Sequence, residues 1–100
     1  MFTTRSIAMQ TYSPAEAQSH LANLPGWQIE NGELVRIFQF KDFVASLHFV
    51  NQVGEFAEAA AHHPDIDIRY NRVRLALVTH SAGGLTAKDF ALAAQASKLA

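Results

Sequence analysis

The sequence predicts an α+β fold in which a four-stranded antiparallel sheet carries helices on one face, in the order helix, hairpin, helix, hairpin, helix. Three observations lead to this prediction. Apolar residues recur at helical spacing in three segments, two segments alternate apolar and polar residues around tight turns, and capping or proline signals separate them. Helices packed on one face would bury the apolar sides of such strands.

Composition favours a single small globular domain over residues 1–100. The chain is 49% hydrophobic and 17% charged, with no internal repeat or low-complexity linker. Residues 1–12 are too polar for a secretory signal and are expected to form a loose N-terminal arm.

Charge and residue usage exclude several kinds of partner and site. A net charge of −1 gives no electrostatic reason to expect nucleic acid or an anionic membrane as partner. No apolar run approaches the roughly 18 residues that a membrane span requires. The absence of cysteine excludes disulfides and thiolate chemistry. A cytoplasmic location is the default expectation.

The first helix has a strong start signal. Ser13 can cap it, Pro14 suits its first position, and Glu16 completes a capping box. A proline and a glycine at positions 25 and 26 predict an end near Asn23.

The first hairpin is predicted around Asn31-Gly32, the preferred pair for a type I′ turn. Its second strand is apolar on both faces, with Leu34 and Phe38 on one side and Val35 and Ile37 on the other. A strand with one solvated face alternates more cleanly, so a crossing segment or another subunit is expected to cover the second side.

The longest helical pattern begins after Asp42, a suitable cap, and ends before Pro64. Its expected buried face consists of Phe43, Leu47, Val50, Gly54, Ala57 and Ala61. Glu58 and His62 are four residues apart and are expected to share a face.

The second hairpin is predicted to turn near residues 70–72, with Val73, Leu75 and Leu77 on one face of its second strand. His80 falls at the end of that strand, and residues 81–84 read as a flexible link. Thr86 and Asp89 form a capping box for a final helix.

Three histidines, His62, His63 and His80, lie at the ends of predicted elements, where loops meet. An imidazole with a pKa near 6.5 exchanges protons at neutral pH, so together they could form an acid/base centre. Each also has a structural interpretation, as a partner for a helix C-terminus, an exposed loop residue or a strand-end polar group.

A zinc site is the second interpretation of this region. The potential ligands are His62, His63, Asp65, Asp67 and His80. No helical HxxxH or HExxH pair holds two of them on one face, so the spacing favours a site without metal. Asp89 and Glu58 can likewise be explained as a capping residue and a solvated helix residue.

Several segments together resemble the pterin-4a-carbinolamine dehydratases. The matching stretches are "LPGW" at 24–27, "RIFQFKDF" at 36–43, "EAAAHHP" at 58–64, "YNRV" at 70–73 and "THSAGGLTAKD" at 79–89. The resemblance extends over about residues 13–98 without a gap. A histidine pair before proline, combined with a downstream Thr-His and Gly-Leu-Thr-x-x-Asp, is far more specific than any single motif.

The resemblance implies an enzyme, a hydro-lyase that removes water from 4a-hydroxytetrahydropterin to give the quinonoid dihydropterin and so recycles a tetrahydrobiopterin-type cofactor. It implies no metal or organic cofactor, and a homodimer or homotetramer. The family's active-site histidines fall on His62, His63 and His80, and its acidic supporting positions on Glu58 and Asp89.

The chemistry suits these residue types, since imidazoles can protonate the leaving hydroxyl and take a proton from the ring N5. His62 and His80 are expected to be the acid/base groups, and His63 to hold the substrate and share in proton transfer. Glu58 is expected to orient an imidazole, and Asp89 to support His80.

One position departs from the family pattern: Ile66 stands where many members have tryptophan. That position borders the site in the family, so pterin stacking or substrate range should differ. The alternative function is a binding, regulatory or assembly scaffold with the same fold. The full set of histidines favours the enzyme.

Overall fold

The structure is a computed structural model that describes residues 10–100. It contains the predicted elements in the predicted order: α1 (Pro14–Leu21), β1 (Gln28–Glu30), β2 (Glu33–Gln39), α2 (Phe43–Ala60), β3 (Asp65–Arg69), β4 (Arg72–Leu77), the short 3₁₀ helix η2 (His80–Ala82) and α3 (Ala87–Leu99). The α+β prediction is therefore confirmed. No helix within residues 10–100 is long and apolar enough to cross a bilayer.

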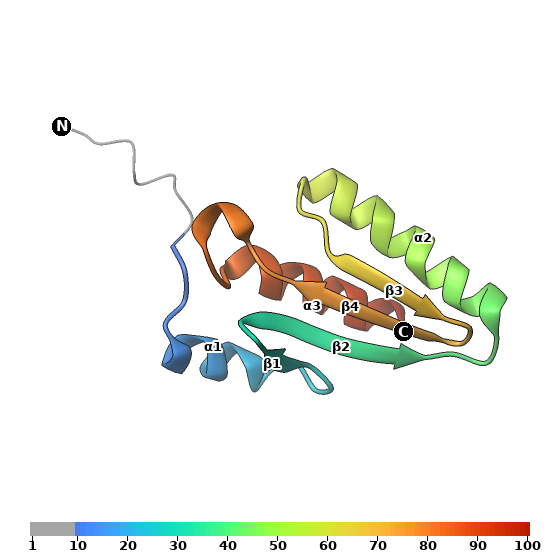
Figure 1. Cartoon of the computed structure of the whole chain (residues 1–100), viewed down its shortest axis with the longest axis horizontal. Coiled ribbons are helices and arrows are strands. Elements are labelled where there is room, and N and C mark those ends of the chain that lie inside the picture. The colour runs from blue at the N-terminus through green and yellow to red at the C-terminus, as the bar shows by residue number, and fades with distance from the viewer. Residues whose placement is uncertain (1–9) are drawn as a thin grey trace.

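The four strands form one antiparallel sheet in the order β1-β2-β4-β3 (Figure 1). β2 and β4 are the central pair, and their register places Phe38 opposite Val73 and Leu34 opposite Leu77. β3 pairs with the other side of β4, with Ile66 opposite Leu75. This register brings Leu34, Phe38, Val73, Leu75 and Leu77 onto one face of the sheet.

The turns of the two hairpins have the conformations that their residues favour. Asn31 and Gly32 both have positive φ, 51° and 80°, which confirms the type I′ turn between β1 and β2. Tyr70 also lies in the left-handed region, with φ 53°, in the turn that joins β3 to β4.

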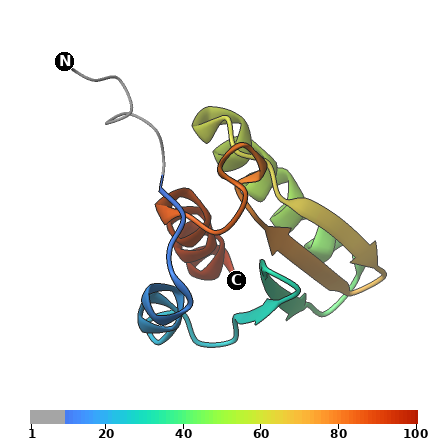
Figure 2. The same ribbon diagram turned by 60° about the vertical axis from the view of Figure 1, so that its left-hand side comes forward.

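The helices form the second layer and bury the apolar face of the sheet. Figures 1 and 2 show α1 beside β1, α2 beside β3, and α3 between the two other helices. The core joins residues of all three helices to the sheet, and among them are Ala17, Phe49, Val53, Phe90, Ala93, Leu34, Phe38, Val73, Leu75 and Leu77. The opposite face of the sheet carries Ile37, which is 53% exposed.

The predicted buried face of α2 is largely wrong. The helix buries Ser46, Phe49, Val53 and Ala57, so only Ala57 belongs to the face expected from the sequence. Phe43 and Leu47 are exposed instead. The helix is apolar on more than one side, and the helical period alone does not say which apolar stripe meets the sheet.

The expected N-terminal arm is described only for its last three residues, and positions 1–9 lie outside the described part of the chain. Within the described part, Tyr12 is packed rather than loose. Its backbone N–H donates to the carbonyl of Leu85 at 2.8 Å, and its ring stacks on His20 with 4.5 Å between centroids. His20 therefore has a structural role here.

Candidate active site

The site begins at the C-terminus of α2, where Ala61 separates the last helical residue, Ala60, from His62. Ala61 takes a left-handed conformation with φ 51°, and its N–H reaches the carbonyl of Glu58. The N–H of His62 donates to the carbonyl of Ala57 at 3.0 Å. These two bonds form a Schellman motif, which fixes the backbone of His62 directly after the helix. Pro64 then prevents any continuation of the helix.

His62 is directed inward and pairs with Asp89. Its Nε2 lies 2.6 Å from Oδ1 of Asp89, and the side chains are 10% and 0% exposed respectively. A buried carboxylate is stable only when its oxygens have partners, and an imidazole N–H supplies a strong one. The pair joins the end of α2 to the first turn of α3, which are 27 residues apart in the sequence.

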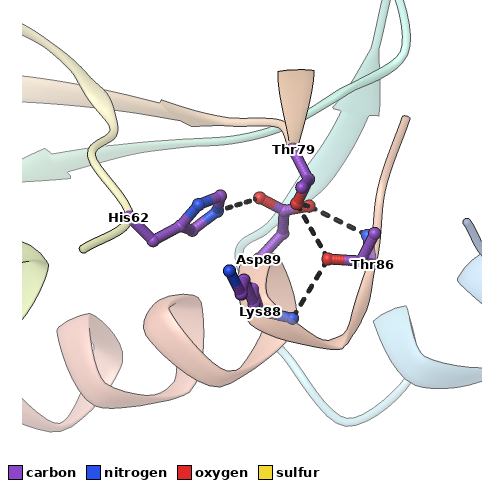
Figure 3. A network of polar contacts seen from close by, with 5 residues as sticks. All are labelled: His62, Thr79, Thr86, Lys88 and Asp89. Carbon is purple, nitrogen blue, oxygen red and sulfur yellow. Dashed lines mark hydrogen bonds and ion pairs between the residues drawn. The ribbon is translucent and has the colours of Figure 1, made fainter. Parts of the chain in front are cut away.

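The second oxygen of Asp89 is held by two threonines (Figure 3). Oδ2 accepts from the hydroxyl of Thr79 at 2.8 Å and from the backbone N–H of Thr86 at 2.9 Å. The two threonine hydroxyls lie 2.8 Å apart, and Oγ1 of Thr86 also accepts from the N–H of Lys88 at 3.2 Å. The predicted capping box of α3 is therefore confirmed, and its carboxylate also binds His62.

His63 and Glu58 form a separate, exposed pair. Nε2 of His63 lies 2.9 Å from Oε1 of Glu58, and the side chains are 62% and 83% exposed. The expectation that Glu58 shares a face with His62 is therefore wrong. The left-handed Ala61 ends the helical repeat, so His62 turns inward while His63 comes over the last turn of α2.

His80 opens η2 at the end of β4 and is exposed. The expectation that Asp89 supports His80 is wrong, because both oxygens of Asp89 are taken by His62, Thr79 and Thr86. His80 nevertheless follows Thr79 directly, so its backbone is tied to the network. The expected flexible link is an ordered turn, in which Thr79 forms a β-bridge with Gly84.

The remaining predicted residues lie on β3. Ile66 is partly buried and packs against the hydrophobic core. Asp67 is oriented toward Arg74 at 3.9 Å rather than toward the histidines. Among residues 10–100, no group of three or more histidine, aspartate or glutamate side chains is close enough to hold a metal ion.

A wide groove lies away from the histidines. It has a volume of about 720 Å³ and lies on the open face of the sheet, lined by Ile37, Asp67, Arg69, Asn71, Arg72 and Arg74. We place the candidate site at the histidines, because a buried imidazole–carboxylate pair within a hydrogen-bond network is the stronger sign of a functional site than an open surface groove.

Sequence reasoning missed Thr79 as a site residue and assigned Thr86 only to the helix cap. The available signal was the position of Thr79 at the end of a buried strand, where a hydroxyl needs a partner. Which partner it finds depends on the packing of α3 against β4, and no local pattern encodes that.

Comparisons with known proteins find similar sequences and structures. The profile of the family described as Pterin 4 alpha carbinolamine dehydratase matches residues 10–99. A protein of Acidobacterium capsulatum, provisionally named pterin-4-alpha-carbinolamine dehydratase, is 56% identical over 91% of this chain and 99% of its own length. A protein of the same provisional name from Chloroflexus aurantiacus is 62% identical over 86% of this chain and 92% of its own.

Two solved structures are also similar. The crystal structure of a transcriptional coactivator/pterin dehydratase from Brucella melitensis has a TM-score of 0.88 and 34% identity, over 91% of this chain and 99% of that one. A pterin dehydratase-like protein identified as a RuBisCO assembly factor in the α-carboxysome has a TM-score of 0.60 and 22% identity, over 73% and 84% of the two chains. The latter likeness shows the fold alone. From the family profile and the two curated relatives, we conclude that the chain belongs to the pterin-4-alpha-carbinolamine dehydratase family.

Proposed function

We propose that this protein eliminates water from a 4a-hydroxytetrahydropterin to give the quinonoid dihydropterin, which would return a tetrahydrobiopterin-type cofactor to use. The observation that carries the proposal is the buried His62–Asp89 pair, which holds one imidazole in a fixed orientation. Two further histidines have exposed side chains and are next to network residues in the sequence, since His63 follows His62 and His80 follows Thr79. Family membership supports the same reaction.

The reaction requires two proton transfers. The C4a–O bond breaks, the hydroxyl takes a proton and leaves as water, the proton on N5 is removed, and a C4a–N5 double bond forms. One proton is donated and one is accepted, so the enzyme ends each turnover with its original proton count. Imidazoles can do both near neutral pH, and the chemistry calls for no metal or organic cofactor.

The roles follow the environment of each side chain. His62, held by Asp89, and His80, at the start of η2, are the proposed acid/base pair. His63 would contact the pterin and share in proton transfer, with Glu58 holding its ring at 2.9 Å. Ile66 would border the pterin with an aliphatic surface.

The test is the dehydration rate of chemically generated 4a-hydroxytetrahydropterin, followed by absorbance. Wild-type protein should accelerate the reaction, and His62→Ala and His80→Ala should each reduce kcat/KM by a factor of about 10² or more. His48→Ala is the matched control, since His48 is an exposed histidine on α2 that lines a different groove, and its rate should equal that of wild type.

Failure of the folded wild-type protein to accelerate dehydration would overturn this proposal. The alternative of a binding or assembly scaffold would then be preferred. Equal activity of His62→Ala and wild type would instead support the dehydratase activity but exclude a role of His62 in the proton transfers.

A further inference from the structure

The network behind His62 contains two buried hydroxyls that the proposed reaction does not use. Thr79 is 3% exposed and Thr86 is fully buried. Thr79 lies two residues after β4, and Thr86 directly precedes α3. Each buried hydroxyl has to be satisfied within the protein, so the directions of its hydrogen bonds can be worked out.

The directions follow from the two backbone N–H groups, of Thr86 and Lys88, which can only donate. The backbone N–H of Thr86 donates to Oδ2 of Asp89, so this oxygen is an acceptor. Thr79 donates to the same oxygen. Since a hydroxyl has one hydrogen, Thr79 must then accept from the hydroxyl of Thr86. The hydroxyl of Thr86 in turn accepts from the N–H of Lys88.

This chain of bonds determines which nitrogen of His62 carries hydrogen. Asp89 has only acceptor oxygens when ionised, so Nε2 of His62 must donate to Oδ1. Nδ1 makes no hydrogen bond within the described part of the chain. No buried side-chain nitrogen or oxygen lacks a partner there, so Nδ1 must reach the protein surface.

We propose that Thr79 and Thr86 are positioning residues that hold Asp89 so that neutral His62 is the Nε2–H tautomer, and that Nδ1 is the nitrogen that exchanges a proton with the substrate. The part that concerns exchange with substrate rests on the proposed dehydratase function. The tautomer part does not, because it concerns the resting protein.

Thr79 also connects this network to His80. Its backbone N–H and carbonyl both bond to Gly84, at 3.1 and 3.3 Å, and its carbonyl accepts from Ala82 and Gly83 in the turn that contains His80. One residue therefore anchors the turn of His80 through its backbone and the carboxylate of Asp89 through its hydroxyl. Loss of the hydroxyl alone should disturb His62 and leave the backbone of the turn in place.

The experiment uses ¹⁵N NMR of the full-length protein to read the tautomer of His62, whose signals are assigned by their loss in His62→Ala. Wild-type protein should show the Nε2–H form, with a downfield Nε2–H proton protected from exchange. In Asp89→Asn the carbonyl must face the N–H of Thr86, so the amide NH₂ faces His62. The hydrogen should then move to Nδ1, with a loss of kcat of at least about 10²-fold.

Thr79→Val and Thr79→Ser separate positioning from packing. Valine keeps the shape of threonine and removes the hydroxyl. It should lower kcat about tenfold with little change in KM and increase the exchange of the Nε2–H proton. Serine restores the hydroxyl and should return both quantities close to wild type. Thr86→Ser should likewise behave as wild type.

The two proposals fail in different ways. An Nδ1–H tautomer in the wild-type protein, or an unchanged tautomer in Asp89→Asn, overturns the present inference even if the enzyme is active. An Nε2–H tautomer in a protein that does not dehydrate the pterin supports the positioning of His62 and overturns the dehydratase. Unchanged kcat and Nε2–H exchange in Thr79→Val would remove Thr79 from the positioning role.

Discussion

At the scale of single residues, Asp89 has two functions because its two oxygens have different partners. Oδ2 accepts from the N-cap backbone of α3 and from Thr79, whereas Oδ1 binds His62. A capping carboxylate is usually a local device. Here burial makes it a tertiary contact as well, so removal of this one side chain affects the helix start and the site together.

We predict that Asp89→Ala destabilises the protein by about 3–5 kcal/mol, since it leaves hydrogen-bonding groups of His62, Thr79 and Thr86 without their buried partner, at about 1–3 kcal/mol each. The measurement is urea unfolding followed by circular dichroism. Glu58→Ala is the control, because the Glu58–His63 pair is exposed and such pairs contribute about 0–1 kcal/mol. Equal losses in the two variants would contradict the importance assigned to the buried network.

At the scale of elements, α2 has two apolar stripes, and the sheet selects one. Phe49 and Val53 are buried against the sheet, whereas Phe43, Val44 and Leu47 remain exposed. The exposed stripe begins with large apolar side chains, whereas an amphipathic helix usually places polar side chains on its solvent side. Burial of Ser46 in the packed stripe is possible because its hydroxyl donates to the carbonyl of Asp42.

The selection of this stripe predicts unequal costs for neighbouring alanine substitutions. Phe49→Ala should destabilise the protein by about 3–5 kcal/mol, because Phe49 is 3% exposed and contacts Phe38 and Phe40. Leu47→Ala, two residues away and 37% exposed, should cost less than about 1 kcal/mol in the monomer. Thermal unfolding of both variants gives the comparison, and a larger loss for Leu47→Ala would reverse the assignment of the buried face.

The end of α2 predicts a stabilising substitution. Ala61 has φ 51° at a position where glycine is usual, and this conformation costs a non-glycine residue roughly 1–2 kcal/mol. Ala61→Gly should therefore raise the free energy of unfolding by about 0.5–1 kcal/mol. Ala59→Gly, two residues earlier in regular helix, should lower it by about 0.5–1 kcal/mol. The same sign for both variants in urea titrations would exclude strain at Ala61.

At the scale of the whole molecule, large hydrophobic side chains of the described residues are exposed at three places. They are the start of α2, with Phe43, Val44 and Leu47, the open face of the sheet, where Ile37 is 53% exposed, and the β3–β4 turn, where Tyr70 is 64% exposed. The sequence had suggested that a further segment or subunit covers the second face of β2. Among the described residues on that face, Val35 is 3% exposed and Ile37 is 53% exposed, so the face is covered only in part, and the homodimer or homotetramer stays a prediction.

We predict that the start of α2 contributes to self-association, because three neighbouring large apolar side chains offer more contact area than Ile37 alone. Val44 is the most exposed of them at 60%, so Val44→Lys should lower the oligomeric state without unfolding the monomer. Sedimentation equilibrium of wild type, Val44→Lys and Ile37→Lys would test this. A change of mass in Ile37→Lys alone would place the contact on the sheet instead.

Local sequence signals predicted the helices, strands and turns, because each signal involves only residues that are close in the sequence. The capping boxes of α1 and α3, the Asn31-Gly32 turn and the alternation in β4 depend on neighbours a few residues apart, and all are present in the structure. The histidines could also be placed at the ends of elements from the sequence. Their partners could not, because each pairing depends on how a helix ends or how two elements pack.

The sequence by itself thus determined the order and class of the elements, the turn at Asn31-Gly32 and the family to which the chain belongs. Only the tertiary structure decided that Asp89 binds His62 and that Glu58 binds His63. The physical reason has two parts. The left-handed residue Ala61 ends the helical repeat, so that His62 is directed inward. The buried carboxylate of Asp89 then needs a hydrogen-bond partner, and the imidazole of His62 provides it. The packing of α3 against the end of β4 then supplies Thr79 to that carboxylate, from a distance of ten residues along the chain.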